Sequence, residues 1–388
     1  MLNIAYIAYT SMDHSGVAEK ILCQVQELQS IGSTVHLIFI DSLDSSNNDY
    51  SDRVNVIYNA FSQLGIISSL AFQLIIPKKL FQTLNRINPD IIYLRYPLYR
   101  PWISRIFSET QIPLVIEING NPLDELKSKG AYLLYLIEKY HGKSLLNIAS
   151  GFVGVSENSI NYALKNINNK NTPYIVIGNG VDCNKVNFLN IYPDDKYYNI
   201  AYVGDYTKWA GIDRLVQPLL KDNTIKLHLI GEGWGNAPEI KLLLKTGIAI
   251  NHGYVPSGKL SNILNNIDVG IGPLGVHRKK FYEATPLKVR RYLAHGIPVI
   301  LGYNDTDIHS EYNFVLKVSS NDEPIDLDLL KEYVNRIRIN PNIRNQARWF
   351  AVSKLGYKIK MMQLSNFLSN ILERSKIDST VETTVLEI

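Results

Sequence analysis

Short apolar runs alternate with amphipathic stretches along most of the chain. The first run, residues 3–8 (NIAYIA), has the length and composition of a buried strand. Residues 15–32 then show the apolar spacing of a helix that ends at a glycine, with Val17, Ile21, Val25 and Leu28 on one face and Gly32 as the stop. Further strand-like runs follow at 34–40, 54–60, 90–96, 113–119, 151–156 and 174–180. Strands that alternate with helices predict right-handed crossovers and a doubly wound parallel sheet.

The alternation stops in a polar, asparagine-rich stretch and then restarts. Strand-like runs recur at 200–205, 225–231, 249–255, 268–272 and 298–303, with helical stretches between most of them. The sequence therefore predicts an α/β protein of two tandem Rossmann-like domains that face each other across a cleft. In such folds the ligand binds beyond the carboxyl ends of the strands. The expected divisions are a first domain 1–183, a linker 184–198, a second domain 199–355, a helix 356–375 that crosses back to the first domain, and a disordered tail 376–388.

A basic cluster surrounds the predicted helix 286–295. Residues 275–291 hold six Lys or Arg side chains and a single carboxylate, Glu283. Thr285 suits the N-cap, Pro286 the first helical position and Gly296 the C-terminal stop, and Val289 and Leu293 are expected to face the core. A helix N-terminus already attracts anions, so the added cations predict a site for a phosphate or diphosphate. Ordinary solvated surface cations remain the alternative for each residue taken alone.

Composition excludes several classes of protein. A formal net charge of +4 over 388 residues is too small for a polycation that coats nucleic acid, so no nucleic-acid partner is expected. Cys23 and Cys183 lack metal or redox spacing, which favours a reducing compartment. No uninterrupted apolar run reaches the length of a membrane span and the N-terminus lacks the pattern of a signal peptide, so a cytoplasmic protein is expected.

Five stretches, in order, resemble motifs of the retaining GT-B glycosyltransferases of family GT4, also called group 1. They are SGVAEKI, IGNGVD, YVGDYTKWAGIDRLV, HGYVPSGKLSNILNNIDVGIGP and EATPLKVRRYLAHGIPVI. The resemblance covers nearly the whole chain, and the last stretch is similar to the family's nucleotide-sugar motif. It implies two GT-B domains and transfer of a sugar from a nucleotide-sugar donor, UDP- or GDP-linked, with no metal and no other cofactor.

The resemblance implies a role for several residues. Glu283 matches a glutamate near the hydroxyls of the transferred sugar. Leu287 matches a residue whose backbone holds the diphosphate, with Pro286 and Lys288 beside it. Gly16 matches the glycine that lets the first domain's loop approach phosphate, and Val255 the strand end whose backbone meets the base. His14, Arg95, Glu117 and Asn119 fall at predicted strand ends, where we expect them on the acceptor side of the cleft, with His14 as a second candidate for catalysis; polar residues that merely end strands are the alternative.

Three positions depart from the family pattern. Arg291 stands eight residues after Glu283, where the family has a second glutamate that accepts hydrogen bonds from the ribose, and arginine has no acceptor. Asp205 and Ala210 stand where family members often have an arginine and a lysine that hold the diphosphate. We therefore expect Lys208, Arg278 and Arg291 to compensate, with Arg291 donating to the ribose or to an additional anionic group.

The resemblance implies that the leaving phosphate helps to deprotonate the acceptor on the same face of the sugar. The expected product belongs to a bacterial surface polysaccharide, O-antigen or capsule, built on a glycan or lipid-linked acceptor. Two alternatives stay open. One is a non-catalytic nucleotide- or glycan-binding protein, which the three departures motivate, and the other is a nucleotide-sugar epimerase of the same fold, which the patterns NGVD and KWAGIDRL disfavour. The acidic pairs DTD (305–307) and DLD (326–328) resemble metal-binding pairs but lie away from the expected donor site, and no metal is predicted.

Two segments of the first domain mix aliphatic and aromatic residues with cations. They are LIIPKKLF (74–81) and RYPLYRPWISRIF (95–107), and this composition suits contact with anionic lipid. We therefore expect peripheral association of the first domain with the inner face of the cytoplasmic membrane. Core aromatic residues with solvated cations are the alternative interpretation of both segments.

Overall fold

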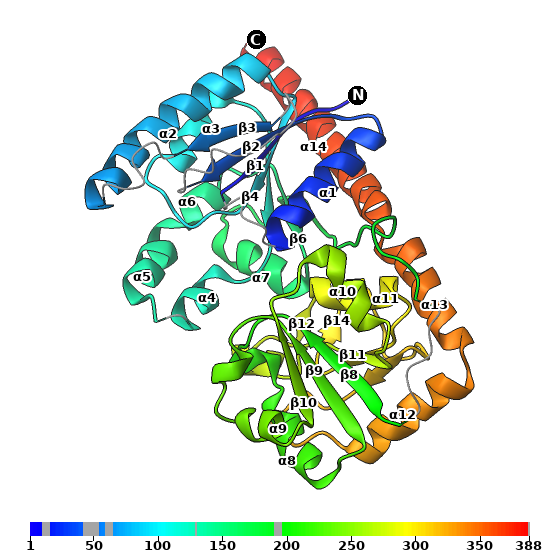
Figure 1. Cartoon of the computed structure of the whole chain (residues 1–388). Helices are drawn as coiled ribbons and strands as arrows, with labels where there is room; N and C mark the ends of the chain where they lie inside the picture. The colour runs from blue at the N-terminus through cyan, green and yellow to red at the C-terminus, as the bar shows by residue number, and fades with distance from the viewer. Residues whose placement is uncertain (10–15, 42–53, 59–64, 129, 190–195, 387–388) are drawn as a thin grey trace. The chain divides into compact units, whose positions relative to one another are not determined.

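The computed structural model describes residues 1–9, 16–41, 54–58, 65–128, 130–189 and 196–386. The chain divides into two compact units, Met1–Ile177 with Tyr357–Ile388, and Gly178–Gly356. Each unit contains a parallel sheet flanked by helices (Figure 1). The α/β class with two Rossmann-like units is therefore confirmed.

The first unit contains a seven-stranded sheet in the order β3-β2-β1-β4-β5-β6-β7. Its strands are β1 (Asn3–Ala8), β2 (Thr34–Asp41), β3 (Val54–Tyr58), β4 (Ile91–Arg95), β5 (Leu114–Ile118), β6 (Gly151–Gly154) and β7 (Tyr174–Val176). Its helices are α1 (Gly16–Ser30), α2 (Gly65–Ile87), α3 (Ile103–Thr110), α4 (Pro122–Ser128), α5 (Tyr132–His141), α6 (Lys143–Leu146), α7 (Glu157–Asn166) and α14 (Tyr357–Leu386). The central strands are continuous apolar runs because both faces of the sheet are covered.

The two segments that were expected to face a membrane supply core residues instead. Ile76 and Leu80 of α2, and Ile103, Ile106 and Phe107 in and beside α3, are buried in the core of the first unit. Their spacing of three or four residues turns these side chains to one helix face, which packs on the sheet. Part of each segment is therefore core, whereas Ile75, Phe81, Leu98, Tyr99 and Trp102 stay partly exposed.

The second unit contains a six-stranded sheet in the order β10-β9-β8-β11-β13-β15 and a small β12-β14 pair. Its strands are β8 (Tyr198–Val203), β9 (Ile225–Ile230), β10 (Ala249–Gly253), β11 (Val269–Ile271), β12 (Glu283–Ala284), β13 (Val299–Leu301), β14 (Asn304–Asp305) and β15 (Val315–Lys317). Its helices are α8 (Asp213–Lys221), α9 (Lys241–Lys245), α10 (Ser257–Leu264), α11 (Leu287–Ala294), α12 (Leu327–Ile339) and α13 (Asn342–Phe350). Short helical turns are η1 (Lys208–Ala210), η2 (Trp234–Asn236), η3 (Val276–Lys279) and η4 (Ala351–Leu355).

The predicted linker is packed against the second unit as far as residue 189. Val186 and Leu189 are buried in that unit's core, and the Leu189 amide donates to the carbonyl of His295 over 3.1 Å. The division between the units lies at Ile177 and Gly178, ahead of the expected position. The apolar residues inside a polar stretch account for the difference, because they can be buried only against a neighbouring core.

Helix α14 belongs to the first unit, although it follows the second unit in sequence. It lies beside α1 (Figure 1) and contributes Met361, Leu364, Leu368 and Ile371 to the core on that face of the sheet. The helix extends to Leu386, through most of the residues for which composition predicts a disordered tail. Within the described part of the chain, no helix combines the length and hydrophobicity needed to cross a bilayer.

Candidate functional site

The carboxyl edge of the second sheet has a topological switch between β8 and β11. The chain moves from β8 to β9 and β10 on one side, and continues from β11 to β13 and β15 on the other. The loops that leave β8 and β11 therefore separate, which is where open α/β sheets bind their ligands. The loop after β8 contains η1, and the chain after β11 runs through η3 and β12 to the N-terminus of α11. The basic cluster expected from the sequence lies on these segments.

Lys288, in the first turn of α11, is directed at the end of β8. Its Nζ lies 3.6 Å from the centroid of the Tyr202 ring and 5.8 Å from that of Trp209 in η1. Directly after β8, Gly204 has a φ of +134°, and a Cβ there would approach Nζ of Lys288 to 2.5 Å. The bare backbone at residue 204 therefore leaves room for the ammonium at the switch point.

Burial lowers the pKa of Lys288 to about 7, although the nearby carboxylate of Asp205 opposes the shift. Desolvation disfavours the charged form of a lysine, so an anion that arrives beside it gains interaction energy and restores the charge. Lys279 reaches the same place, because its Nζ lies 4.5 Å from the centroid of the Trp209 ring. Two cations from different elements thus meet at one side chain of η1, beside the N-terminal end of α11.

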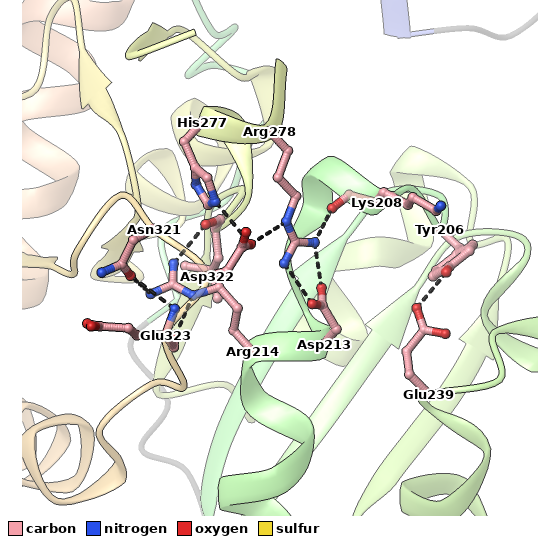
Figure 2. Close-up of polar contacts among 11 residues, drawn as sticks. Tyr206, Lys208, Asp213, Arg214, Glu239, His277, Arg278, Asn321, Asp322 and Glu323 are labelled. Carbon is pink, nitrogen blue, oxygen red and sulfur yellow. Dashed lines mark hydrogen bonds and ion pairs between the residues drawn. The ribbon is translucent and has the colours of Figure 1, made fainter. Parts of the chain in front are cut away.

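Arg278 has a different environment from the one expected. Figure 2 shows its guanidinium between Asp213 and Asp322, with Asp213 accepting two hydrogen bonds at 2.8 and 2.7 Å and Asp322 one at 2.7 Å. Nη1 also donates to the carbonyl of Lys208 over 2.6 Å. The hydrogen bonds to Asp213, and then those to Asp322, raise the pKa of Arg278 despite partial burial. These contacts argue against a direct phosphate contact and for a role in fixing η1, which carries Lys208.

Asp205 and Ala210 have local roles that explain why they differ from the family pattern. Oδ1 of Asp205 accepts from the amide of Glu232 over 2.8 Å and so joins the loops after β8 and β9. Ala210 is buried, and its carbonyl accepts from the amide of Leu274 over 2.8 Å. A buried position is unfavourable for the ammonium of a lysine. The exposed side chain of Lys208, two residues earlier, extends from the same loop (Figure 2).

Glu283 lies in β12, before the helix and outside its first turn. It pairs with Asn304 of β14, and its Oε1 accepts from the hydroxyl of Thr306 over 2.8 Å. At this position Glu283 does not complement the helix dipole, because that effect is confined to the first turn. The short β12-β14 pair holds the carboxylate partly exposed.

A buried ion network that the sequence analysis missed fixes the approach to α11. The Arg290 side chain is fully buried and donates to both carboxylate oxygens of Asp305, one of them at 2.6 Å, and to Asp307 over 3.0 Å. It also donates to the carbonyl of Asn179 over 3.1 Å, and the Asn179 amide donates to the carbonyl of Thr285 over 2.7 Å. The DTD pair therefore binds an arginine. Among the described residues, no group of three or more metal-ligating side chains is present.

The ends of α11 were predicted in part. Val289 and Leu293 are buried as expected, and Gly296 has the left-handed φ of 76° that ends the helix. The N-cap is Pro286 instead of Thr285, and Leu287 is the first helical residue. The hydroxyl of Thr285 accepts from Asn179 over 3.2 Å, which commits it to another contact.

Arg291 lies on the side of α11 that carries His295. The His295 ring is buried, with its Nδ1 2.9 Å from the carbonyl oxygen of Asn187. Burial lowers the pKa of His295 to about 4, the contact with Asn187 opposes this shift, and the charges of Arg291 and Arg348 add to it. His295 is thus a neutral structural residue at physiological pH.

The expected acceptor-side residues converge in the first unit, at its own switch point between β1 and β4. Oε1 of the buried Glu117 lies 3.0 Å from Nζ of Lys20, and its Oε2 accepts from Asn119 over 3.0 Å and from Arg95 over 3.5 Å. Lys20 also donates to Oδ1 of Asn119 over 2.8 Å. Burial alone would raise the pKa of Glu117, but Lys20 and Arg95 outweigh it and lower that pKa to about 2.

Lys20 was missed because its position in an amphipathic helix gave no sign of an inward side chain. Gly16 begins α1, at the same edge of the sheet, and Val255 follows β10 at the corresponding edge in the second unit, where it packs against the core. His14 lies outside the described residues.

Comparison with known proteins gives matches among solved structures. No family model and no curated protein sequence matches the chain. The sucrose-phosphate synthase of Thermosynechococcus elongatus aligns over 96% of this chain and 99% of its own, with 14% identity and a TM-score of 0.68. HepE of Anabaena, in complex with UDP and glucose, aligns over 95% and 100%, with 13% identity and a TM-score of 0.63. WaaG, a glycosyltransferase involved in lipopolysaccharide biosynthesis, aligns over 94% and 99%, with 12% identity and a TM-score of 0.63. These likenesses extend over both units and confirm the architecture that the motifs predict: the chain has the GT-B fold.

Proposed function

We propose that this protein is a retaining, GT4-type glycosyltransferase that takes a nucleoside diphosphate sugar as donor. The observation that carries the proposal is the position of Lys288, whose poorly solvated ammonium lies at the switch point of the second sheet, beside the N-terminal turn of α11. The likeness to a UDP-bound structure supports this choice of ligand and favours a UDP- or GDP-linked donor.

The proposed donor site uses residues of several loops. Lys288 and Lys208 neutralise the diphosphate, and the backbone N–H of Leu287 donates to it. Pro286, which has no N–H, fixes the start of the helix beside it. Glu283 accepts hydrogen bonds from the transferred sugar, because its carboxylate is held partly exposed by Thr306. The backbone at Val255 contacts the base, and Gly16 is assigned to the donor phosphate. His14 is assigned to catalysis on the acceptor side.

The chemistry needs no nucleophilic side chain. As the bond between the anomeric carbon and the diphosphate oxygen breaks, negative charge grows on the leaving group, and fixed cations and N–H groups stabilise it. The acceptor oxygen forms the new bond on the same face, and its proton passes to an oxygen of the leaving diphosphate. Protein cations supply the charge compensation, so we assign no metal and no other cofactor.

Arg95, Glu117 and Asn119 are assigned to the acceptor. The pKa of Glu117, about 2, keeps this carboxylate ionised, so it orients Lys20, Arg95 and Asn119 and does not act as a general acid. Asn119 and Arg95, which Glu117 holds in place, are assigned to contact acceptor hydroxyls. The likeness to WaaG, a glycosyltransferase involved in lipopolysaccharide biosynthesis, supports an acceptor in bacterial surface polysaccharide synthesis. We assign a glycan or lipid-linked acceptor, such as one of O-antigen or capsule, on the cytoplasmic side of the membrane.

A non-catalytic role is the second candidate, favoured by the use of Asp205 and Arg278 in internal contacts. Release of nucleoside diphosphate from a panel of nucleotide sugars, measured with and without acceptor glycans, separates the two. A transferase releases the nucleotide slowly alone and faster with its acceptor. Donor binding with no release under any condition, or no binding of any donor, contradicts the proposed activity.

Arg291 supplies a test of donor recognition. We assign its guanidinium to a donor contact with the ribose or with an additional anionic group, since it stands where the family has a ribose-binding glutamate. Arg291→Glu should change the preference among the donors of the panel. Unchanged affinity and turnover with every donor would show that Arg291 plays no part in recognition.

A further inference from the structure

Helix α5 turns its apolar side chains outward. The most exposed are Tyr132, Leu133, Leu134, Leu136 and Tyr140, at 65, 73, 44, 47 and 63%. With about 100° between successive residues, Leu136 and Tyr140 lie at the centre of the exposed face and Tyr132 and Leu133 flank them. Exposed apolar residues are common singly, but a contiguous group on one helix indicates an interaction surface.

The inward side of α5 is polar, which fixes this unusual orientation. Glu138 is buried and accepts from the hydroxyls of Tyr96 and Tyr162 over 2.6 and 3.1 Å and from the amide of Tyr99 over 2.7 Å. Burial, followed by the neighbouring charges, raises the pKa of both phenols, so they stay protonated donors. After the helix, a Cβ at Gly142 would lie 2.4 Å from Oε1 of Glu138, so this approach needs glycine. Turning the apolar face inward would break these contacts.

On α5 and α6 the exposed charge has one sign. Lys139 on α5 and Lys143 on α6 are exposed, whereas the one carboxylate of α5 points inward. The neighbouring α4 adds the exposed Lys127 but also carries Asp124 and Glu125. Nζ of Lys139 lies 5.8 Å from the centroid of the Tyr140 ring. Leucine and tyrosine flanked by lysine is the composition of helices that lie in the headgroup region of a bilayer. A second copy of this face would bring like charges together, which disfavours a dimer as the occupant.

Helix α5 follows the acceptor-side residues Glu117 and Asn119 closely in the sequence. The segment after β5 leads from Glu117 and Asn119 into α4 and then α5, which lie next to each other (Figure 1). The residues that bind Glu138 include Tyr96 and Tyr99, which directly follow Arg95.

We propose that the face formed by Tyr132, Leu133, Leu136, Lys139 and Tyr140, the α5 face, docks on the surface of a bilayer that contains anionic lipid. The apolar side chains enter the headgroup boundary and the lysines contact lipid phosphates. This surface replaces the two segments of the sequence analysis, whose residues Ile76, Leu80, Ile103, Ile106 and Phe107 are in the core. Delivery of a lipid-linked acceptor to this edge rests on the proposed function, but the docking itself does not.

Flotation of the full-length protein with phosphatidylcholine vesicles, with and without phosphatidylglycerol, tests the docking. The double variant Leu133→Glu/Leu136→Glu should weaken binding to the anionic vesicles at least about tenfold, and Lys139→Glu at least about fivefold. The matched control is Ile339→Glu at the end of α12, because Ile339 is 84% exposed in the second unit. For each variant, thermal unfolding measures stability, and titration with UDP and GDP measures nucleotide binding.

Loss of vesicle binding in the α5 variants alone, with unfolding and nucleotide binding as in the unmodified protein, is the expected result. Absence of binding to any vesicle, or equal binding by the double variant, overturns the proposal. If the unmodified protein is a dimer and the double variant a monomer that still binds vesicles, the face belongs to a second copy and the proposal is also wrong. Failure of nucleotide binding in every variant contradicts the proposed function instead, because α5 does not contribute to the second unit.

Discussion

At the scale of single residues, adjacent arginines in α11 have opposite roles. Arg290 is fully buried with Asp305 and Asp307, whereas Arg291 is partly exposed. The sequence shows two arginines side by side and cannot indicate which one finds a buried carboxylate, because its partners lie fifteen or more residues away and on another element. The sequence analysis therefore singled out Arg291 and did not consider Arg290.

The arginine pair gives a stability prediction. Arg290→Met should lower the free energy of unfolding of the second unit by about 3 to 5 kcal/mol, because it leaves the buried carboxylate of Asp305 and the partly buried carboxylate of Asp307 without their cation. Arg291→Met is the matched control and should cost less than about 1 kcal/mol as a partly exposed substitution. Urea unfolding followed by tyrosine and tryptophan fluorescence measures both. Equal losses in the two variants would contradict the structural role assigned to Arg290.

At the scale of elements, the loop after β8 and the first turn of α11 together form the proposed donor site. The sequence predicted the helix, its buried residues and its terminal glycine, because these depend on local periodicity and backbone conformation. It did not predict that Arg278 would hold η1 through Asp213 and Asp322, since that network joins three segments of the chain. Gly204 allows the loop after β8 and the first turn of α11 to come together, because only a glycine lets Lys288 approach the end of β8.

Gly204→Ala should therefore lower the affinity for nucleotide beyond what its backbone strain alone would cause. A Cβ at residue 204 displaces Nζ of Lys288, and the positive φ adds about 1 to 2 kcal/mol of backbone strain. Gly247→Ala is the control, because its φ of +67° is also unfavourable but a Cβ there meets nothing within 4 Å. Calorimetric titration with UDP and GDP should show weaker binding for Gly204→Ala alone. Equal affinities for the two variants would show that Gly204 plays no part in nucleotide binding.

At the scale of the whole molecule, the last helix returns to the first unit. Periodicity predicted two Rossmann-like domains and the alternation of their elements, because each strand and helix carries its own pattern. The exact division did not follow from the sequence, because burial of Val186 and Leu189 in the second unit depends on contacts distant in the chain. The acceptor-side residues Arg95, Glu117 and Asn119 were predicted together from strand ends, but their link to Lys20 was not.

Substitution in α14 tests the composition of the units. Leu368→Ala removes a fully buried side chain from the first unit's core and should lower the stability of that unit by about 2 to 5 kcal/mol. Differential scanning calorimetry should show the loss in one transition, while UDP or GDP continues to stabilise the other. If the variant shifts only the nucleotide-stabilised transition, α14 does not belong to the first unit.

The central claim, that Lys288 binds the donor diphosphate, is tested most directly by calorimetric titration of nucleotide sugars into the protein and into Lys288→Met. The titrations are done below and above pH 7. Lys245→Met, at an exposed position in α9, is the control. The pKa of Lys288 is about 7 in the free protein, and a bound diphosphate raises it, so binding should be strongest at low pH and weaken as pH rises through this value. Lys288→Met should bind at least about tenfold more weakly at low pH and lose this pH dependence. If Lys288→Met binds UDP- or GDP-sugars as tightly as the unmodified protein, or if no nucleotide sugar binds, the assignment of the donor site is wrong.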